Sequence, residues 1–191
     1  LPAGHPFPMG KYPLLHERLV ATGVVTADDV MTPDEAPMEW LERVHTRAYL
    51  ERVATGALSA AEIRRIGVPW SAHLWRRSRL ATHGTYLAAC AALDDGIAGN
   101  LAGGTHHAHR AFGSGYCVFN DLAVATLAML AERRVQRIAI VDLDVHQGDG
   151  NAAPGGRSMP GGRADGSRRP CGPARARRPR ASGHEPRSGC R

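Results

Sequence analysis

The sequence predicts an α/β fold in which helices cover both faces of a parallel sheet, and two observations carry this prediction. Residues 138–141 read Ile-Ala-Ile-Val, and a strand that is apolar on both faces is typical of the centre of a parallel sheet. A helical pattern at residues 121–134 leads directly into that strand. This succession of helix and strand favours a parallel sheet.

Helix start and stop signals divide the chain before this strand. Pro13 stands near the start of a first helix, and Gly56 follows the end of a second. Ser59-Ala-Ala-Glu62 is a capping-box pattern, and Ser71 could cap a long helix that Gly96 ends. The expected helices cover residues 12–22, residues 46–55, a short stretch from residue 59, residues 71–95 and residues 121–134.

Ionisable side chains follow the predicted strand directly. Because side chains alternate along an extended chain, Asp142, Asp144 and His146 share one face. They stand at the carboxyl end of the strand, where open α/β sheets bind their ligands. An Asp at a strand end often only caps the next turn, but burying several ionisable groups unpaired would cost several kcal/mol. The cluster therefore favours a metal or catalytic site, and Gly148 and Gly150 suit a tight turn that leaves it.

A second cluster precedes the first in the sequence. Residues 103–109 read Gly-Gly-Thr-His-His-Ala-His, and residues 115–121 read Gly-Tyr-Cys-Val-Phe-Asn-Asp. Adjacent histidines in a glycine-flanked loop suit proton transfer, because imidazole titrates near neutral pH and neighbouring carboxylates tune it. A His-rich loop by itself is weak evidence, because such loops are often only solvated.

Together, these motifs resemble the histone deacetylase family of the arginase/deacetylase superfamily. The matching runs are Gly-Gly-Thr-His-His-Ala, Gly-Tyr-Cys-Val-Phe-Asn-Asp and Asp-Leu-Asp-Val-His-Gln-Gly-Asp-Gly, in the family's order and spacing. The resemblance extends from about His5 to Ala153 and is closest in style to bacterial and class IV-like members. It implies a three-layer, parallel-sheet arginase/deacetylase fold that is incomplete on its C-terminal side.

The resemblance also implies a metal site and a substrate tunnel. Asp144 and His146 would be two of the three protein ligands of a catalytic Zn²⁺, and both are suitable zinc ligands. Asp142, Asp144 and His146 would contribute oxygens to a structural K⁺ site beneath the zinc. Gly115 and Tyr116 match positions that line the family's narrow acyl-lysine tunnel.

The family's acid–base groups map onto the two motifs. His106 and His107 would be the tandem histidines beside the metal-bound water, with His107 the better candidate for general base and later general acid. Asp142 would orient His106, and Asp149 would orient His107. The implied reaction is hydrolysis of an acetyl or longer acyl amide, and the substrate is an acetylated lysine protein or an acetylated small amine.

The family's third zinc ligand and its oxyanion-stabilising tyrosine have no match in this chain. Residues 154–191 contain no Val, Ile, Leu, Phe, Tyr or Trp, so they are predicted to be a disordered tail after an incomplete domain of residues 1–153. The tail has ten arginines against Asp165 and Glu185, a net charge near +8, whereas the whole chain carries +6. Two explanations remain open: a reading-frame change, which we favour, or a genuine tail that binds nucleic acid through its arginines.

Two function classes follow. One is a zinc-dependent deacetylase that is truncated and weakly active or inactive, and the other is a non-catalytic fragment that binds nucleic acid only if the tail is genuine. No apolar run is long enough for a membrane span, and the cysteine spacing favours a reducing cytoplasm. Because an incomplete parallel sheet exposes an apolar edge, we expect the isolated chain to aggregate or to be molten.

Overall fold

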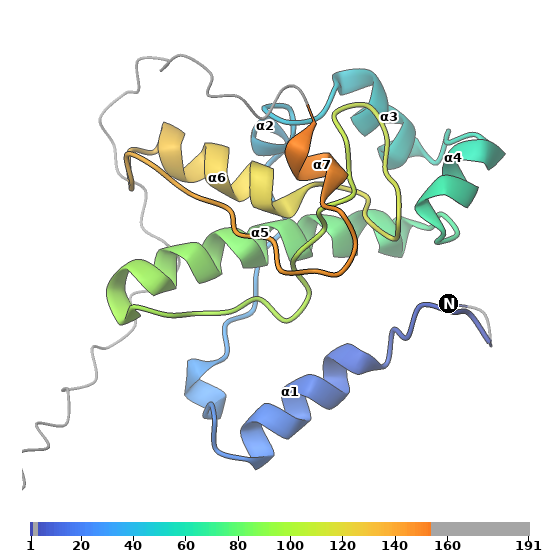
Figure 1. Ribbon diagram of the computed structural model, residues 1–191. Helices are drawn as coiled ribbons and strands as arrows, with labels where there is room; N and C mark the ends of the chain where they lie inside the picture. Colours follow the sequence, from blue (N-terminus) through green and yellow to red (C-terminus); the bar gives the residue numbers. More distant parts are fainter. Residues whose placement is uncertain (2–3, 154–191) are drawn as a thin grey trace, which may run out of the picture.

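Helices α5 and α6 lie side by side at the centre of the computed structural model and pack against one another (Figure 1). The structure describes residue 1 and residues 4–153, so the predicted disordered tail lies outside the described residues. The elements in chain order are α1 (Lys11–Ala21), the 3-10 helix η1 (Ala27–Asp29), α2 (Met38–Leu41), α3 (Arg47–Thr55), α4 (Ala60–Ile66), α5 (Ala72–Asp95), α6 (Asp121–Ala131) and α7 (Asp149–Ala152).

Most helix boundaries follow the capping signals in the sequence. The side chains of Thr46, Ser59, Ser71 and Asn120 each accept a hydrogen bond from the backbone N–H three positions later. These contacts satisfy amide groups that have no partner inside the helix. The predictions of helices that begin at Thr46, Ser59 and Ser71 are therefore confirmed, and so is the stop of α5 at Gly96.

The last long helix is shorter than expected. Helix α6 ends at Ala131, whereas the sequence pattern predicted a helix that continues to Arg134. Arg133 has a positive φ of 54°, and a residue in this left-handed conformation ends a helix. The prediction of its C-terminal end was therefore wrong.

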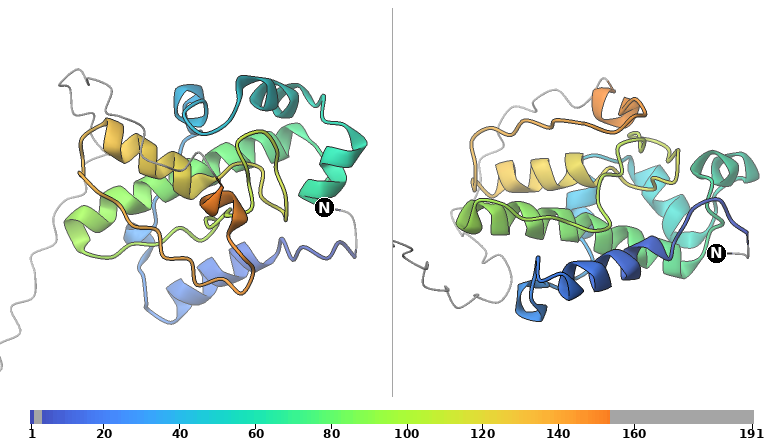
Figure 2. Two further views of the ribbon diagram at one scale, coloured as in Figure 1. Left: turned by 45° about the horizontal axis from the view of Figure 1, so that its top comes forward. Right: turned by 60° about the horizontal axis from the view of Figure 1, so that its bottom comes forward.

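The buried side chains form two clusters, one around α3 and the loop before α6, and one between α5 and α6. Helix α1 buries no residue and lies on one side of α5, while the segment that leads to α7 lies on the opposite side of α6 (Figure 2, right). The first cluster includes Leu41, Tyr49, Leu50, Val53, Phe119 and Val124, and the second includes Tyr86, Leu87, Ala125, Ala128 and Met129.

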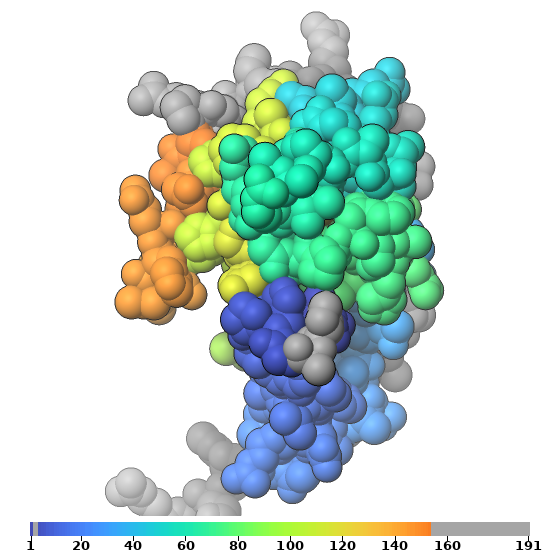
Figure 3. Space-filling model, turned by 90° about the vertical axis from the view of Figure 1, so that its right-hand side faces the viewer, coloured from blue at the N-terminus to red at the C-terminus, as the bar shows by residue number. Residues whose placement is uncertain are grey.

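The prediction of a buried strand at residues 138–141 is wrong for this structure. This segment has no strand assignment, and the sole β-bridge among the described residues joins Ser114 and Cys117. Val141 is 77% exposed, and Leu143 and Val145 are both 91% exposed. The segment lies at the outer edge of the molecule (orange in Figure 3). A strand needs hydrogen-bonding partners on a neighbouring strand, and no other described segment is placed to supply them.

Within residue 1 and residues 4–153, no helix has both the length and the apolar character needed to cross a membrane.

Candidate active site

A buried carboxylate, Asp121, shapes the loop that carries the tandem histidines. Asp121 has no exposed surface and lies in the first turn of α6. Its Oδ2 accepts a hydrogen bond from the Gly104 backbone N–H at 3.0 Å, and its Oδ1 accepts one from the Thr105 N–H at 2.7 Å. The Thr85 hydroxyl on α5 also donates to Asp121. Asp121 belongs to one of the sequence motifs, but the sequence analysis predicted no role for it. An acidic residue at the start of a predicted helix could have indicated one.

His45 connects the same loop to the start of α6. His45 Nδ1 lies 2.9 Å from the carbonyl oxygen of His109, and its Nε2 accepts a hydrogen bond from the Asn120 N–H at 3.1 Å. A single neutral tautomer, with the proton on Nδ1, makes both contacts. Burial lowers the pKa of His45 to about 4. The sequence predicted no role for this histidine.

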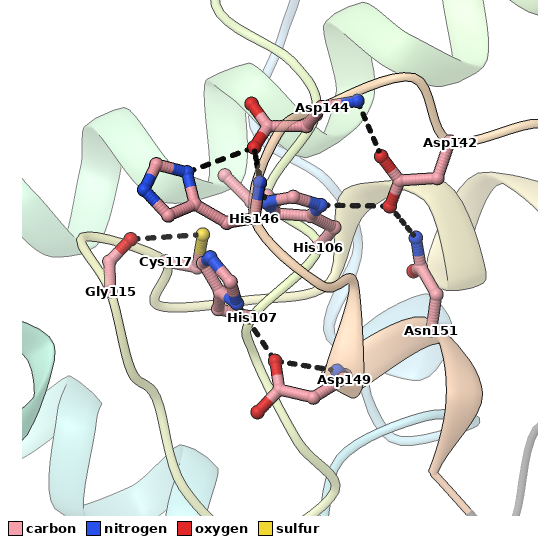
Figure 4. Close-up of polar contacts among 12 residues, drawn as sticks. His106, His107, Gly115, Cys117, Asp142, Asp144, His146, Asp149 and Asn151 are labelled. Atoms are coloured by element: carbon pink, nitrogen blue, oxygen red, sulfur yellow. Dashed lines mark hydrogen bonds and ion pairs between the residues drawn. The ribbon is translucent and has the colours of Figure 1, made fainter.

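The structure brings His106 and Asp142 together, as Figure 4 shows. His106 Nδ1 lies 2.8 Å from Asp142 Oδ2, and the His106 side chain is buried. Because a carboxylate only accepts hydrogen bonds, this contact holds the proton on Nδ1 of the neutral ring. The hydrogen bond from His106 lowers the pKa of Asp142 below its usual value. The Asn151 side-chain amide donates to the same carboxylate oxygen at 3.4 Å.

A second pair of the same kind joins His107 and Asp149. His107 Nδ1 lies 2.7 Å from Asp149 Oδ1, and the rings of His106 and His107 have centroids 4.1 Å apart. The hydrogen bond from His107, with a further one from His109, lowers the pKa of Asp149 to about 2. Gly115 leaves room for the His107 ring, because a Cβ there would lie 2.7 Å from His107 Cδ2.

Asp144 and His146 lie side by side next to these pairs. His146 Nδ1 is 3.0 Å from Asp144 Oδ1, and that same oxygen accepts the His146 backbone N–H at 2.7 Å. The hydrogen bond from the His146 backbone lowers the pKa of Asp144. A carboxylate oxygen and an imidazole nitrogen are both suitable zinc ligands, so this pair fits a zinc ion in donor type. Within the described residues, no group of three or more His, Cys, Asp or Glu side chains could hold a metal ion.

One cavity of about 430 Å³ is lined by the tandem histidines His106 and His107 and by the Asp144–His146 pair. Gly115 and Tyr116 form part of its wall. Tyr116 has a positive φ of 66°, and its backbone N–H donates to the Ile66 carbonyl oxygen at 2.7 Å. Its ring packs on Phe7, with centroids 4.9 Å apart. All eight candidate site residues predicted from the sequence therefore lie in one region. Six of them line the cavity, and the other two, Asp142 and Asp149, contact His106 and His107.

Comparison with known proteins identifies a family and several relatives of this chain. A family model described as histone deacetylase domain matches residues 5–154. The chain is 48% identical over 152 residues to an uncharacterized protein of Picosynechococcus, covering 80% of this chain and 51% of that protein. It is 33% identical over 156 residues to the acetoin utilization protein AcuC of Bacillus subtilis, covering 76% of this chain and 40% of that protein.

Solved structures agree with the sequence relatives. The crystal structure of an HDAC homolog from Aquifex aeolicus has a TM-score of 0.65 and 28% sequence identity, covering 78% of this chain and 42% of that chain. An HDAC homolog complexed with SAHA has a TM-score of 0.64 at the same identity and coverage. The chain thus spans about half the length of these relatives or less. On the match to residues 5–154, the chain belongs to the histone deacetylase family.

Proposed function

We propose that this chain carries the acid–base half of an active site that hydrolyses acetyl or longer acyl amides of lysine or a related amine, with zinc as cofactor. The observation that carries the proposal is the 2.7 Å contact between His107 Nδ1 and Asp149 Oδ1. It keeps the proton of neutral His107 on Nδ1. The other ring nitrogen, Nε2, then has a lone pair that is available for proton transfer on the cavity side.

His107 would act as general base and then as general acid. Its Nε2 accepts a proton from the attacking water and later delivers that proton to the leaving amine. Asp149 stabilises the imidazolium that forms between these two events. Asp142 holds His106 by a similar contact, and this fixes the second ring beside the first.

Asp144 and His146 would hold the zinc ion. When bound, zinc polarises the acyl carbonyl and lowers the pKa of a bound water toward neutrality. Asp144 and His146 would be two of the three protein ligands that the family resemblance implies, and within the described residues no group of three or more suitable side chains could hold a metal ion. We therefore expect the 191-residue chain to be weakly active or inactive. A structural K⁺ ion near Asp142, Asp144 and His146 stays a prediction.

Gly115 and Tyr116 would form the wall on which the methylene stem of an acyl-lysine packs. Both line the cavity, and the Tyr116 ring offers an aromatic face to an aliphatic chain. A cavity of this volume suits a small acylated amine or a single acyl-lysine side chain. A reducing cytoplasm remains the expected location.

Acetate release and zinc binding test the proposal together. The purified chain is incubated with an acetyl-lysine peptide and with an acetylated small amine, with zinc and after zinc removal. We expect any acetate release to be slow and zinc-dependent, to be abolished in His107→Ala, and to be unchanged in His73→Ala, at an exposed position on α5. Calorimetry should show zinc binding that weakens on Asp144→Ala. Zinc-independent release, or release retained by His107→Ala, would contradict the mechanism.

The alternative function depends on residues 154–191, which lie outside the described residues. Their ten arginines motivate the prediction of nucleic-acid binding. Resequencing the coding DNA after the Asn151 codon and translating all three frames tests the frame-change hypothesis. Salt-sensitive DNA binding that disappears when residues 154–191 are deleted would favour the non-catalytic fragment.

A further inference from the structure

A third histidine, His109, contacts the same carboxylate as His107. Its Nε2 lies 3.1 Å from Asp149 Oδ2, while His107 Nδ1 lies 2.7 Å from Asp149 Oδ1. The two oxygens of Asp149 are therefore each engaged by a different imidazole. His109 does not line the cavity, so it does not touch a substrate bound there.

Three further contacts, one to the ring and two to the backbone, hold His109 in this position. The ring stacks on Phe112, with centroids 4.4 Å apart and planes 19° from parallel, and the Arg65 guanidinium lies 4.7 Å from the Phe112 centroid. The His109 backbone N–H donates to the Phe112 carbonyl oxygen at 2.9 Å, and the His109 carbonyl oxygen contacts His45. Backbone and ring are thus both fixed, and the His109 side chain is only 21% exposed.

Asp149 depends on its own hydrogen bonds for its orientation, because the helix that it begins contains no buried residue. It begins α7, a helix of four residues, and follows a segment without a strand assignment whose apolar side chains are exposed. His107 and the Gly150 backbone N–H, at 3.1 Å, both reach Oδ1, so without His109 the carboxylate could rotate about its side-chain bonds. The donor on Oδ2 removes that freedom.

We propose that His109 is a positioning residue, which donates its Nε2–H to Asp149 and so locks the carboxylate in the orientation that holds His107. This inference rests on the proposed function for its role in catalysis, but the contact itself can be tested without activity. Asp149 accepts hydrogen bonds from His107, His109 and the Gly150 backbone N–H, and the Cys117 thiol is near enough to interact with it electrostatically.

NMR of the full chain with ¹⁵N-labelled histidine gives the direct test. At neutral pH, His109 should carry its ring proton on Nε2, and His107 should show a protected Nδ1–H. In His109→Phe, which keeps an aromatic ring on Phe112 but loses the donor, exchange of the His107 Nδ1–H with water should accelerate about tenfold. In His109→Gln, which restores an N–H donor, it should slow again.

His73→Phe, at an exposed position on α5, is the matched control and should leave the exchange unchanged. A His109 proton on Nδ1 in the unaltered chain would overturn the proposal, and this measurement needs no variant to fold. Equal exchange in His109→Phe and the unaltered chain would also overturn it and leave His109 as a packing residue. Acetate release that does not depend on zinc, or that His107→Ala retains, would count against the proposed function alone, because the exchange measurement does not depend on activity.

Discussion

His106 Nδ1 and Asp142 Oδ2 lie 2.8 Å apart although 36 positions separate these residues in the sequence. This contact joins the histidine loop to the segment that follows α6. A parallel contact joins His107 to Asp149, across 42 positions. The two motifs therefore form one site in which each adjacent histidine has its own carboxylate.

Asp142→Asn should lower zinc-dependent acetate release by about tenfold to a hundredfold, a typical loss when the carboxylate partner of an active-site histidine is removed. The amide can present its N–H₂ group to His106, and the ring proton then no longer needs to lie on Nδ1. Acetate release and the ¹⁵N shifts of His106 measure the two consequences. If neither changes, Asp142 does not orient His106.

Asp121→Ala should destabilise the fold by about 3 kcal/mol. The change leaves the Gly104 and Thr105 amides and the Thr85 hydroxyl without their buried acceptor, and unsatisfied buried donors cost about 1–3 kcal/mol each before the structure relaxes. Urea unfolding measures the free energy, with Asp95→Ala at the exposed end of α5 as the control. Equal stability of the two variants would show that the Asp121 contacts contribute little.

The free energy of unfolding should fall as the pH drops from about 6.5 to about 4, because of His45. Burial lowers the pKa of this histidine to about 4 in the folded state, against 6.5 in an unfolded chain. The unfolded state therefore binds the proton first. The stability is fully present above pH 6.5 and is lost as the pH falls toward 4, by up to about 3 kcal/mol.

Comparison with His45→Gln isolates this effect from other titrating groups. The variant should be less stable near pH 7, because it disturbs the contacts to His109 and Asn120, and its stability should depend less on pH between 4 and 6.5. Urea unfolding at several pH values provides the measurement. The same slope in both proteins would rule out His45 as the group responsible.

Gly148→Ala should disrupt the site more than Gly99→Ala. A Cβ at Gly148 would overlap Asp142 Oδ2, the oxygen that holds His106, whereas a Cβ at Gly99 meets nothing within 4 Å. We expect the first variant to change the NMR signals of the His106 ring and the second to leave them unaltered. Similar spectra for both would mean that the turn at Gly148 adjusts without moving Asp142.

The exposed apolar segment after α6 should promote aggregation. Leu143 and Val145 are both 91% exposed, and exposed apolar segments with unpaired backbone groups associate readily. The double change Leu143→Ser and Val145→Ser should raise the soluble fraction, measured by light scattering, with little loss of stability. As a control, Val118→Ser at a buried position should lower stability instead. A sharp cooperative melt of a monomeric unaltered chain would contradict this prediction.

Local interactions allowed the helices to be predicted from the sequence. Thr46, Ser59 and Ser71 cap the helices that begin after them, and each contact spans three positions. Such interactions depend on nearby residues alone, so a pattern of a few letters is enough to locate them. The choice of His106, His107, Asp142, Asp144, His146 and Asp149 also came from short motifs, and the structure places these residues in one region.

Tertiary structure alone decided the features that depend on distant partners. The Ile-Ala-Ile-Val run has the composition of a buried strand, but a strand forms only beside another strand, and no described segment pairs with it. The roles of Asp121, His45 and His109 likewise depend on contacts across many positions. The sequence by itself therefore determined the helices and the chemical groups of the site, because these follow from local patterns. The family resemblance, and no local pattern, implied which carboxylate meets which histidine, and only long-range packing in the folded chain forms these two contacts.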